Sequence, residues 1–262
     1  MNPSNFAELY ERHLVAPLFR PWAEVILQRM EPAAGERLLD VACGTGIVAR
    51  LAKELMGGEA RVVGVDLNPQ MLAVARAIAP DIDWREGNAG ALPVGNTEKF
   101  DVVVCQQGLQ FFPDKAAAVR EMRRVLAPDG RLAIATWRPL TEIPLLRELH
   151  RIAERHVGAV VDRRHSFGDA TSLERLLVDA GLRDVRVETI SRTTRVVDSA
   201  VFVRLNAMAI VGMSAGAAAM DDARRAEVAA AIAHDSSEVL PPYTDGEGLA
   251  FDISTNVALA AS

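Results

Sequence analysis

The sequence predicts an α/β fold: a doubly wound, mostly parallel sheet that ends in an antiparallel strand pair and carries helical insertions. Three observations support this prediction. Apolar segments alternate with helical patterns between residues 37 and 137, as expected for strands covered on both faces. The first of these segments runs into an acid and a glycine turn. Two later segments, 185–189 and 251–259, alternate apolar with polar or small residues, which is typical of half-exposed antiparallel strands.

The first predicted strand covers residues 38–41 and is followed by a turn that contains Gly44 and Gly46. Glycines at this point permit positive φ angles and allow the backbone to approach a polar ligand closely. A helical pattern follows, with apolar residues on one face over 48–55. Strand, glycine turn and helix together predict the nucleotide-binding half of a doubly wound sheet.

The second predicted strand, 61–65, ends at Asp66. An acid about twenty residues beyond the glycine turn can accept hydrogen bonds from ribose hydroxyls. The alternative is an acid that only caps the following helix. That helix begins with Asn68 and Pro69, a capping residue and a proline in the first turn.

Three further strands are predicted at 82–85, 101–105 and 131–137. Asp114 is the expected cap of the helix that precedes the last of them. A tight turn at residues 128–130 is expected to end that helix before the strand begins.

The pattern changes after residue 137. Thr171 and Glu174 have the spacing of a capping box, and Gly181 is the expected end of the helix that they begin. The expected organisation is an N-terminal helical segment, a cofactor-binding core, a helical insert, a continuation of the core, a helical lid insert and a final core strand, at 1–36, 37–137, 138–170, 171–191, 192–248 and 249–262.

Composition indicates a protein of the cytoplasm. The chain has 262 residues, of which 50% are hydrophobic, enough for one substantial core. Its net charge of −6 disfavours a nucleic-acid partner, because phosphates attract clustered positive charge. Cys43 and Cys105 end apolar strands, which predicts buried thiols and no disulfide framework. No secretory signal is visible over residues 1–12, and the small-apolar stretch 207–220 is too short to span a bilayer. We therefore expect no membrane partner.

The acid before the glycine turn indicates which kind of nucleotide binds. Gly44 to Ala49 fits the loose dinucleotide pattern G-x-G-x-x-A, but Asp40 lies inside the end of the first strand. Its carboxylate would repel a pyrophosphate and attract an ammonium group. An amino-acid-bearing nucleoside therefore suits the site better than a dinucleotide.

A set of motifs follows in order, LDVACGTG at 39–46, VGVD at 63–66 with Met71, GNA at 87–89 with Leu-Pro at 92–93, FDVVV at 100–104 and REMRRVLAPDGR at 120–131. This set resembles the class I S-adenosylmethionine-dependent methyltransferases, in particular the small-molecule branch that includes ubiquinone/menaquinone-biosynthesis C-methyltransferases. The resemblance covers 37–137 continuously and 10–27 and 167–190 more loosely. It implies a Rossmann-like sheet, S-adenosyl-L-methionine as cofactor and S-adenosyl-L-homocysteine as product.

The resemblance also implies roles for single residues. Asp40 and the backbone of the glycine turn would hold the methionine part of the cofactor, and Asp66 the ribose. The family often has an acid where this chain has Asn88, whose amide oxygen can still accept a hydrogen bond from the adenine amino group. The implied cofactor-binding residues are Tyr10, Asp40, Ala42, Cys43, Gly44, Thr45, Gly46, Asp66, Leu67, Met71, Gly87, Asn88, Ala89, Cys105 and Gln106. For Tyr10, plain packing is the alternative.

Methyl transfer requires an acceptor held in line and water kept out. The sequence contains no nucleophile elbow and no metal-ligand spacing. The acceptor pocket is expected outside the carboxyl ends of the strands, lined by Gln107, Gln110, Phe111 and Trp137. Three histidines of the insert are candidate general bases for a hydroxyl acceptor, with a structural or exposed role as the alternative for each: His150, His156 and His165.

The lid is expected to select the acceptor. Residues 207–213 are small and flexible apolar groups that either line an adaptable pocket or form a core helix. We therefore expect a small, apolar or aromatic acceptor. Two other functions remain open at this point: an NAD-dependent oxidoreductase and a non-catalytic S-adenosylmethionine-binding protein. Nucleic-acid methylation is disfavoured, because no Asn-Pro-Pro-Tyr-like motif follows the fourth strand.

Overall fold

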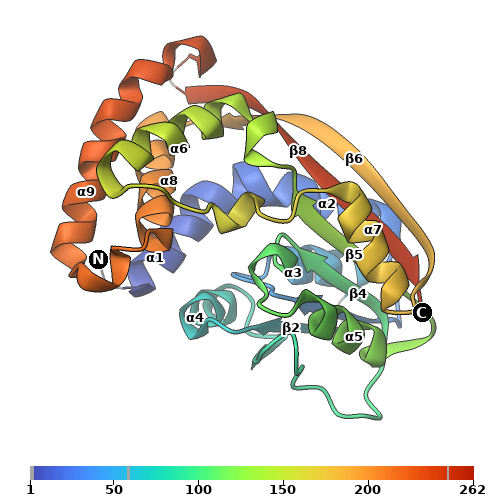
Figure 1. Cartoon of the computed structure of the whole chain (residues 1–262). Helices are drawn as coiled ribbons and strands as arrows, with labels where there is room; N and C mark the ends of the chain where they lie inside the picture. The colour runs from blue at the N-terminus through green and yellow to red at the C-terminus, as the bar shows by residue number, and fades with distance from the viewer. Residues whose placement is uncertain (1–2, 58–59, 247) are drawn as a thin grey trace.

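One mixed sheet forms the centre of the computed structural model, which describes residues 3–57, 60–246 and 248–262. The strand order is β3-β2-β1-β4-β5-β8-β6 (Figure 1). The first five strands of this order are parallel, and β8 runs antiparallel to β5 and β6, which confirms the predicted architecture. The strands are β1 (Arg37–Val41), β2 (Arg61–Asp66), β3 (Asp83–Glu86), β4 (Phe100–Gln106), β5 (Leu126–Trp137), β6 (Arg183–Val196), β7 (Thr244–Asp245) and β8 (Gly248–Ala261).

Helices cover both faces of the sheet. Alternation along β1 shows the division: Leu38 packs with α2, α3 and α4, whereas Leu39 packs with α5 and α7, and both leucines are fully buried. The two hydrophobic clusters hold the parallel strands between helical layers. These helices are α2 (Arg20–Met30), α3 (Ile47–Met56), α4 (Pro69–Ile78), α5 (Lys115–Val125) and α7 (Ala170–Asp179).

Most predicted helix ends are confirmed, with one correction. Asn68 caps α4, Asp114 caps α5, and Gly181 follows α7 with φ +82°. The capping box expected at Thr171 is wrong, because the Asp169 carboxylate accepts a hydrogen bond from the Ser172 N–H at 2.7 Å and starts the helix earlier.

The remaining helices gather beyond the carboxyl ends of the strands, at the upper left of Figure 1. Buried residues of α6, α8 and α9 form a separate cluster there. These helices are α6 (Pro144–Val157), α8 (Ser199–Met213) and α9 (Asp222–Asp235). The short 3-10 turn η2 (Leu109–Phe111) follows β4, and five others precede or follow these helices in the chain: η3 (Leu140–Glu142), η4 (Arg163–His165), η5 (Ala217–Ala219), η6 (Ser236–Val239) and η7 (Pro241–Tyr243). No helix among the described residues is long and apolar enough to cross a bilayer.

Two predicted boundaries require correction. Residues 192–196, expected in the lid, belong to β6, because this strand pairs with β8 as far as Val196 opposite Leu249. The turn at 128–130 was expected to separate a helix from a strand, but it lies inside β5. Opposite this turn, the pairing of β4 with β5 shifts in register between Phe100 and Val102.

The N-terminal helical segment contains a π-helix, η1 (Glu11–Phe19), between α1 (Pro3–Tyr10) and α2. Pro17 lies within η1. Proline has no N–H to donate, which disturbs the regular α pattern at this point. The π-helix was not predicted, because apolar periodicity does not distinguish it from an α-helix.

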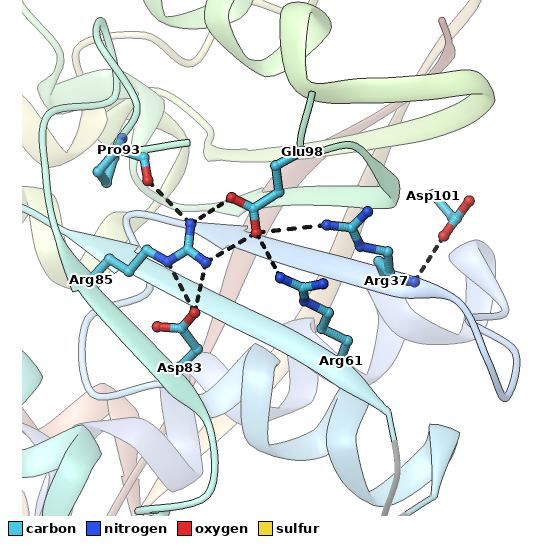
Figure 2. Close-up of polar contacts among 7 residues, drawn as sticks. All are labelled: Arg37, Arg61, Asp83, Arg85, Pro93, Glu98 and Asp101. Carbon is cyan, nitrogen blue, oxygen red and sulfur yellow. Dashed lines mark hydrogen bonds and ion pairs between the residues drawn. The ribbon is translucent and has the colours of Figure 1, made fainter. Parts of the chain in front are cut away.

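A charged cluster fastens the loop between β3 and β4 (Figure 2). Glu98 lies among Arg37, Arg61 and Arg85, at 3.6, 3.2 and 2.9 Å. Arg85 also donates to the Pro93 carbonyl oxygen at 3.1 Å. Because these arginines come from β1, β2 and β3, the cluster ties the loop to three strands. At the start of this loop the Gly87 N–H donates to the Asp66 carbonyl oxygen at 3.0 Å, which holds Gly87 beside the end of β2.

Candidate functional site

The carboxyl end of β1 carries a buried acid. Asp40 is 1% exposed, and its Oδ2 accepts a hydrogen bond from the Ala49 N–H of α3 at 3.1 Å. Its Oδ1 has no hydrogen-bond partner among the described residues. Burial is the main cause that raises the pKa of Asp40 to about 8. A cationic group beside the unpaired oxygen would favour the ionised form, so this carboxyl is suited to a positively charged ligand.

The two glycines of the turn are needed for different reasons. Gly46 has φ +88°, and the Trp84 indole occupies the space that a Cβ would require. Gly44 has φ +56°, and a Cβ there would meet only the Tyr10 Oη, at 4.0 Å. Gly46 therefore serves packing, whereas Gly44 leaves a cradle in which a ligand can approach the backbone. Nothing in the sequence pattern indicated that Trp84 lies under the turn.

Asp66 links the end of β2 to the glycine turn. Its Oδ2 accepts a hydrogen bond from the Gly44 N–H at 2.8 Å, and its Oδ1 accepts one from the Asn68 N–H at 2.8 Å. Burial is the main cause that raises the pKa of Asp66. The structure thus brings together the acid and the glycine that the sequence placed in register.

A cavity of about 870 Å³ extends from this turn to the helices beyond the sheet. Many predicted site residues line it: Tyr10, Ala42, Gly44, Asp66, Leu67, Met71, Gly87, Asn88, Ala89, Gln107, Phe111, Trp137 and His165. Its other end is mostly apolar and is lined by side chains that include Leu14, Leu18, Phe19, Leu146, Phe202, Leu205, Met208, Met213 and Ile253. Arg163, Arg164 and Asn206 add polar groups to the lining. The cavity therefore joins a polar, acidic end to an apolar end.

Other predicted cofactor residues lie behind the cavity wall. Asp40 and Thr45 are each 1% exposed, and Cys105 is fully buried. Cys43 is also a buried free thiol, so the prediction of two buried thiols is confirmed. Gln106 does not line the cavity, because its amide donates to the Phe19 carbonyl oxygen at 3.0 Å.

Aromatic side chains of the N-terminal segment cover the cavity. The Tyr10 and Phe19 ring centroids are 5.0 Å apart, and Phe19 lies 6.1 Å from Trp137. Arg50 of α3 donates to the Glu11 carboxylate at 2.7 Å and holds this segment beside the glycine turn. Burial, followed by the Asp66 charge, raises the pKa of Tyr10, so its hydroxyl stays protonated.

The end of β4 forms another part of the wall. Gln107 is 5% exposed, lines the cavity and has φ +55°, a conformation that residues with a Cβ adopt rarely and mostly near functional sites. Its amide donates to the Thr255 hydroxyl at 3.3 Å. Gln110 does not line the cavity, because its amide donates to the Gln107 carbonyl oxygen at 2.9 Å. Phe111 is 43% exposed at the cavity, and Phe112 packs partly against the core.

The three candidate histidines have different positions. His165 lines the cavity. His150 lies outside it, with Nε2 3.1 Å from the Val160 carbonyl oxygen. His156 pairs with Asp235 of α9 at 2.8 Å, also away from the cavity. Only the first of the three therefore lies where an acceptor would bind.

Helix α8 combines both roles considered for residues 207–213. Ala207, Ile210 and Val211 are buried in the helical cluster. Met208 and Met213 line the cavity. Arg163, Arg164 and Asn206 also line the cavity and were not predicted, because only the fold brings η4 and α8 to it. In the part of the chain that the structure describes, no group of three or more His, Cys, Asp or Glu side chains is arranged to hold a metal ion.

Comparisons with known proteins identify the family and the fold. A family model described as a methyltransferase domain matches residues 39–134. The 2-phytyl-1,4-naphtoquinone methyltransferase of Thermosynechococcus vestitus is 37% identical over 134 residues, which are 49% of this chain and 59% of that relative. The demethylmenaquinone methyltransferase of Shouchella clausii is 30% identical over 191 residues, which are 65% of this chain and 80% of that relative.

A solved structure has a similar fold over almost the whole chain. It is the phosphoethanolamine N-methyltransferase 2 of Haemonchus contortus in complex with phosphomonomethylethanolamine and S-adenosylhomocysteine. The TM-score is 0.60 at 17% identity, and the match covers 99% of this chain and 57% of that chain. At this identity the likeness concerns the fold.

Proposed function

The chain belongs to the class I S-adenosylmethionine-dependent methyltransferases, and we propose that it transfers a methyl group by in-line displacement to a small, apolar or aromatic molecule. The observation that carries this proposal is the single cavity that joins the acidic glycine turn to an apolar, aromatic end. Such a cavity suits a charged nucleoside at one end and an apolar acceptor at the other.

The residues at the acidic end fit S-adenosylmethionine. Asp40 lies behind the cavity wall with an unpaired, buried oxygen, and its charge would attract an ammonium group bound at the glycine turn. Gly44 leaves room there beside its backbone. Asp66 would accept hydrogen bonds from the ribose hydroxyls, and Met71 and Asn88 would lie at the adenine. The bound cofactor supplies an activated methyl group. The chain itself orients the acceptor and excludes water, which can contribute several kcal/mol or more to catalysis.

The apolar end supports the proposed acceptor class. Phe19, Trp137 and Phe202 present aromatic surface, and Met208 and Met213 add flexible apolar groups. These side chains favour an aromatic or lipid-like molecule, and quinone-type compounds, as named in two relatives, fall within this class. We further propose a cytoplasmic location without a nucleic-acid partner, which the two free cysteines and the net charge of −6 support.

Ligand-dependent unfolding tests the proposal. S-adenosylhomocysteine at about one hundred times its dissociation constant should add about 2.7 kcal/mol to the free energy of unfolding, whereas NAD should add none. Stabilisation by NAD alone would instead identify an oxidoreductase. Methyl transfer from labelled S-adenosylmethionine to apolar but not hydrophilic acceptors completes the test. Binding without transfer to acceptors of either kind would favour a non-catalytic binding protein.

A further inference from the structure

His165 lies where an acceptor would meet the end of β4. It ends η4, which packs against η2 and β5. Its side chain lines the cavity, although the residue is only 8% exposed. Since η2 directly follows β4, the imidazole stands beside the part of the sheet where this fold opens towards an acceptor.

The hydrogen bond of His165 determines which nitrogen is free. Nδ1 lies 2.9 Å from the Arg138 carbonyl oxygen. A carbonyl oxygen only accepts hydrogen bonds, so Nδ1 carries the hydrogen and Nε2 carries a lone pair. Nε2 forms no hydrogen bond with any described residue, and the residue lines the cavity. The free lone pair is therefore accessible from the cavity.

Burial and the neighbouring Arg164 keep the His165 imidazole neutral. Arg164 forms hydrogen bonds with both oxygens of Asp162, at 2.8 and 2.6 Å, and with the Asn206 amide oxygen at 2.9 Å. Burial, and then the positive charge of Arg164, lower the pKa of His165 to about 4, against the opposing effect of Asp162. His150 of α6 also lowers this pKa, and η2 contributes no ionisable side chain. Nε2 is therefore unprotonated at neutral pH and free to accept a proton, but the lowered pKa makes it a weak base that requires an acidic acceptor hydroxyl.

Arg163 supplies a positive charge at the same place. It lines the cavity, is exposed and makes no ion pair with any side chain that the structure describes. It would attract negative charge that develops on an acceptor oxygen and would disfavour a cationic amine acceptor. His165 can accept the proton of an acceptor hydroxyl, and Arg163 on the same turn can stabilise the negative charge left on its oxygen. Together they suit an acceptor that carries a hydroxyl group.

We propose that His165 is the general base of the reaction and that the acceptor is an apolar molecule with an acidic hydroxyl, a phenol or an enol, methylated on oxygen. This inference rests on the proposed function and names the substrate class of the same site. The acceptor O–H bond breaks, and Nε2 of His165 takes the proton. An O–CH₃ bond forms as the sulfonium C–S bond breaks and its electron pair remains on sulfur. The proton leaves Nε2 for solvent after product release.

The test compares two probes, 2-naphthol and 2-methoxynaphthalene. The second has a methyl group in place of the hydroxyl hydrogen and so cannot donate a hydrogen bond to Nε2. Binding of each to the full chain is measured by calorimetry in the presence of S-adenosylhomocysteine. His165→Asn retains an N–H donor for the Arg138 carbonyl oxygen but lacks Nε2, so it separates base from scaffold. His234→Asn, an exposed position on α9, is the matched control.

The wild-type protein should bind 2-naphthol about fivefold more tightly than 2-methoxynaphthalene, as expected for one hydrogen bond. His165→Asn should lose this preference and keep its affinity for S-adenosylhomocysteine, whereas His234→Asn should behave as the wild type. A wild-type protein without the preference, or a His165→Asn variant that retains it, overturns the inference. If the wild-type protein does not bind S-adenosylhomocysteine at all, the proposed function itself fails.

Turnover gives a second readout. With S-adenosylmethionine and 2-naphthol, the product should be 2-methoxynaphthalene, and His165→Asn should reduce its rate at least about a hundredfold at pH 7. Because naphthol ionises in alkaline solution, the rate of this variant should recover as pH rises. A methyl group on a ring carbon, or a variant rate that does not depend on pH, contradicts the assignment of oxygen and base.

Discussion

Asp40→Asn tests the electrostatic account of the site. In the folded protein the carboxyl keeps its proton up to about pH 8, whereas its ordinary pKa is 3.8. The unfolded chain has released this proton at neutral pH, so folding must restore it. At about 1.4 kcal/mol per pH unit, this costs about 4 kcal/mol of stability at pH 7.

The sign of the pH dependence follows from the raised pKa. Between pH 3.8 and about 8 the folded state holds a proton that the unfolded state lacks, so the contribution of Asp40 to stability falls as pH rises. An asparagine has no such proton, and its amide oxygen can still accept the hydrogen bond from Ala49. Without bound ligand, Asp40→Asn should therefore be more stable than the wild type, by an amount that grows from pH 5 to pH 8 and is small near pH 4.

Urea unfolding at several pH values measures this difference directly. Calorimetric binding of S-adenosylhomocysteine in buffers of different ionisation enthalpy measures the second consequence. The wild-type protein should release close to one proton at pH 7, because the ligand ammonium stabilises the ionised Asp40. Asp40→Asn should release none from this site and bind more weakly. A pH-independent difference in stability, or ligand binding without proton release, would refute the reasoning.

Three further predictions concern the turn, the ribose acid and the proposed base. Gly44→Val should fold but lose S-adenosylhomocysteine binding, whereas Gly46→Val should unfold at lower temperature because its side chain collides with Trp84; equal melting temperatures would show that the two glycines are equivalent. Asp66→Ala should weaken S-adenosylhomocysteine binding at least about tenfold with the fold retained, because the charge-assisted hydrogen bonds proposed between its carboxylate and the ribose hydroxyls are lost; unchanged calorimetric affinity would remove Asp66 from the site. Because of His165, the wild-type protein should lose about 3 kcal/mol of stability as pH falls from 6.5 to 4, since only the unfolded state takes up a proton on this imidazole in that range. A His165→Asn variant with the same acid sensitivity in urea unfolding would contradict this.

Patterns in the sequence predicted those parts of the fold that local chemistry determines. Continuous apolar runs identified most of the parallel strands, and period-two alternation identified β6 and β8. Capping chemistry located the starts of α4 and α5. Strand length was less predictable, because β6 continues to Val196 through pairing with β8 rather than through its own side-chain pattern.

The candidate site was predicted on the cofactor side and incompletely on the acceptor side. Asp66 ends β2 and Gly44 follows β1, and because these strands are neighbours in the sheet, their contact follows from topology. Trp84 lies under the turn, and Arg163 reaches the cavity, through contacts between distant segments. The sequence offered three equivalent histidines, and only the packing of η4 against η2 distinguishes His165 from the others.

A crystal structure of the full chain with S-adenosylhomocysteine tests the central claim most directly. The account predicts the ligand in the cavity, with its amino-acid part at the glycine turn beside Asp40 and its ribose at the Asp66 carboxylate. Ligand density at another location, or an empty turn at saturating ligand concentration, would contradict it.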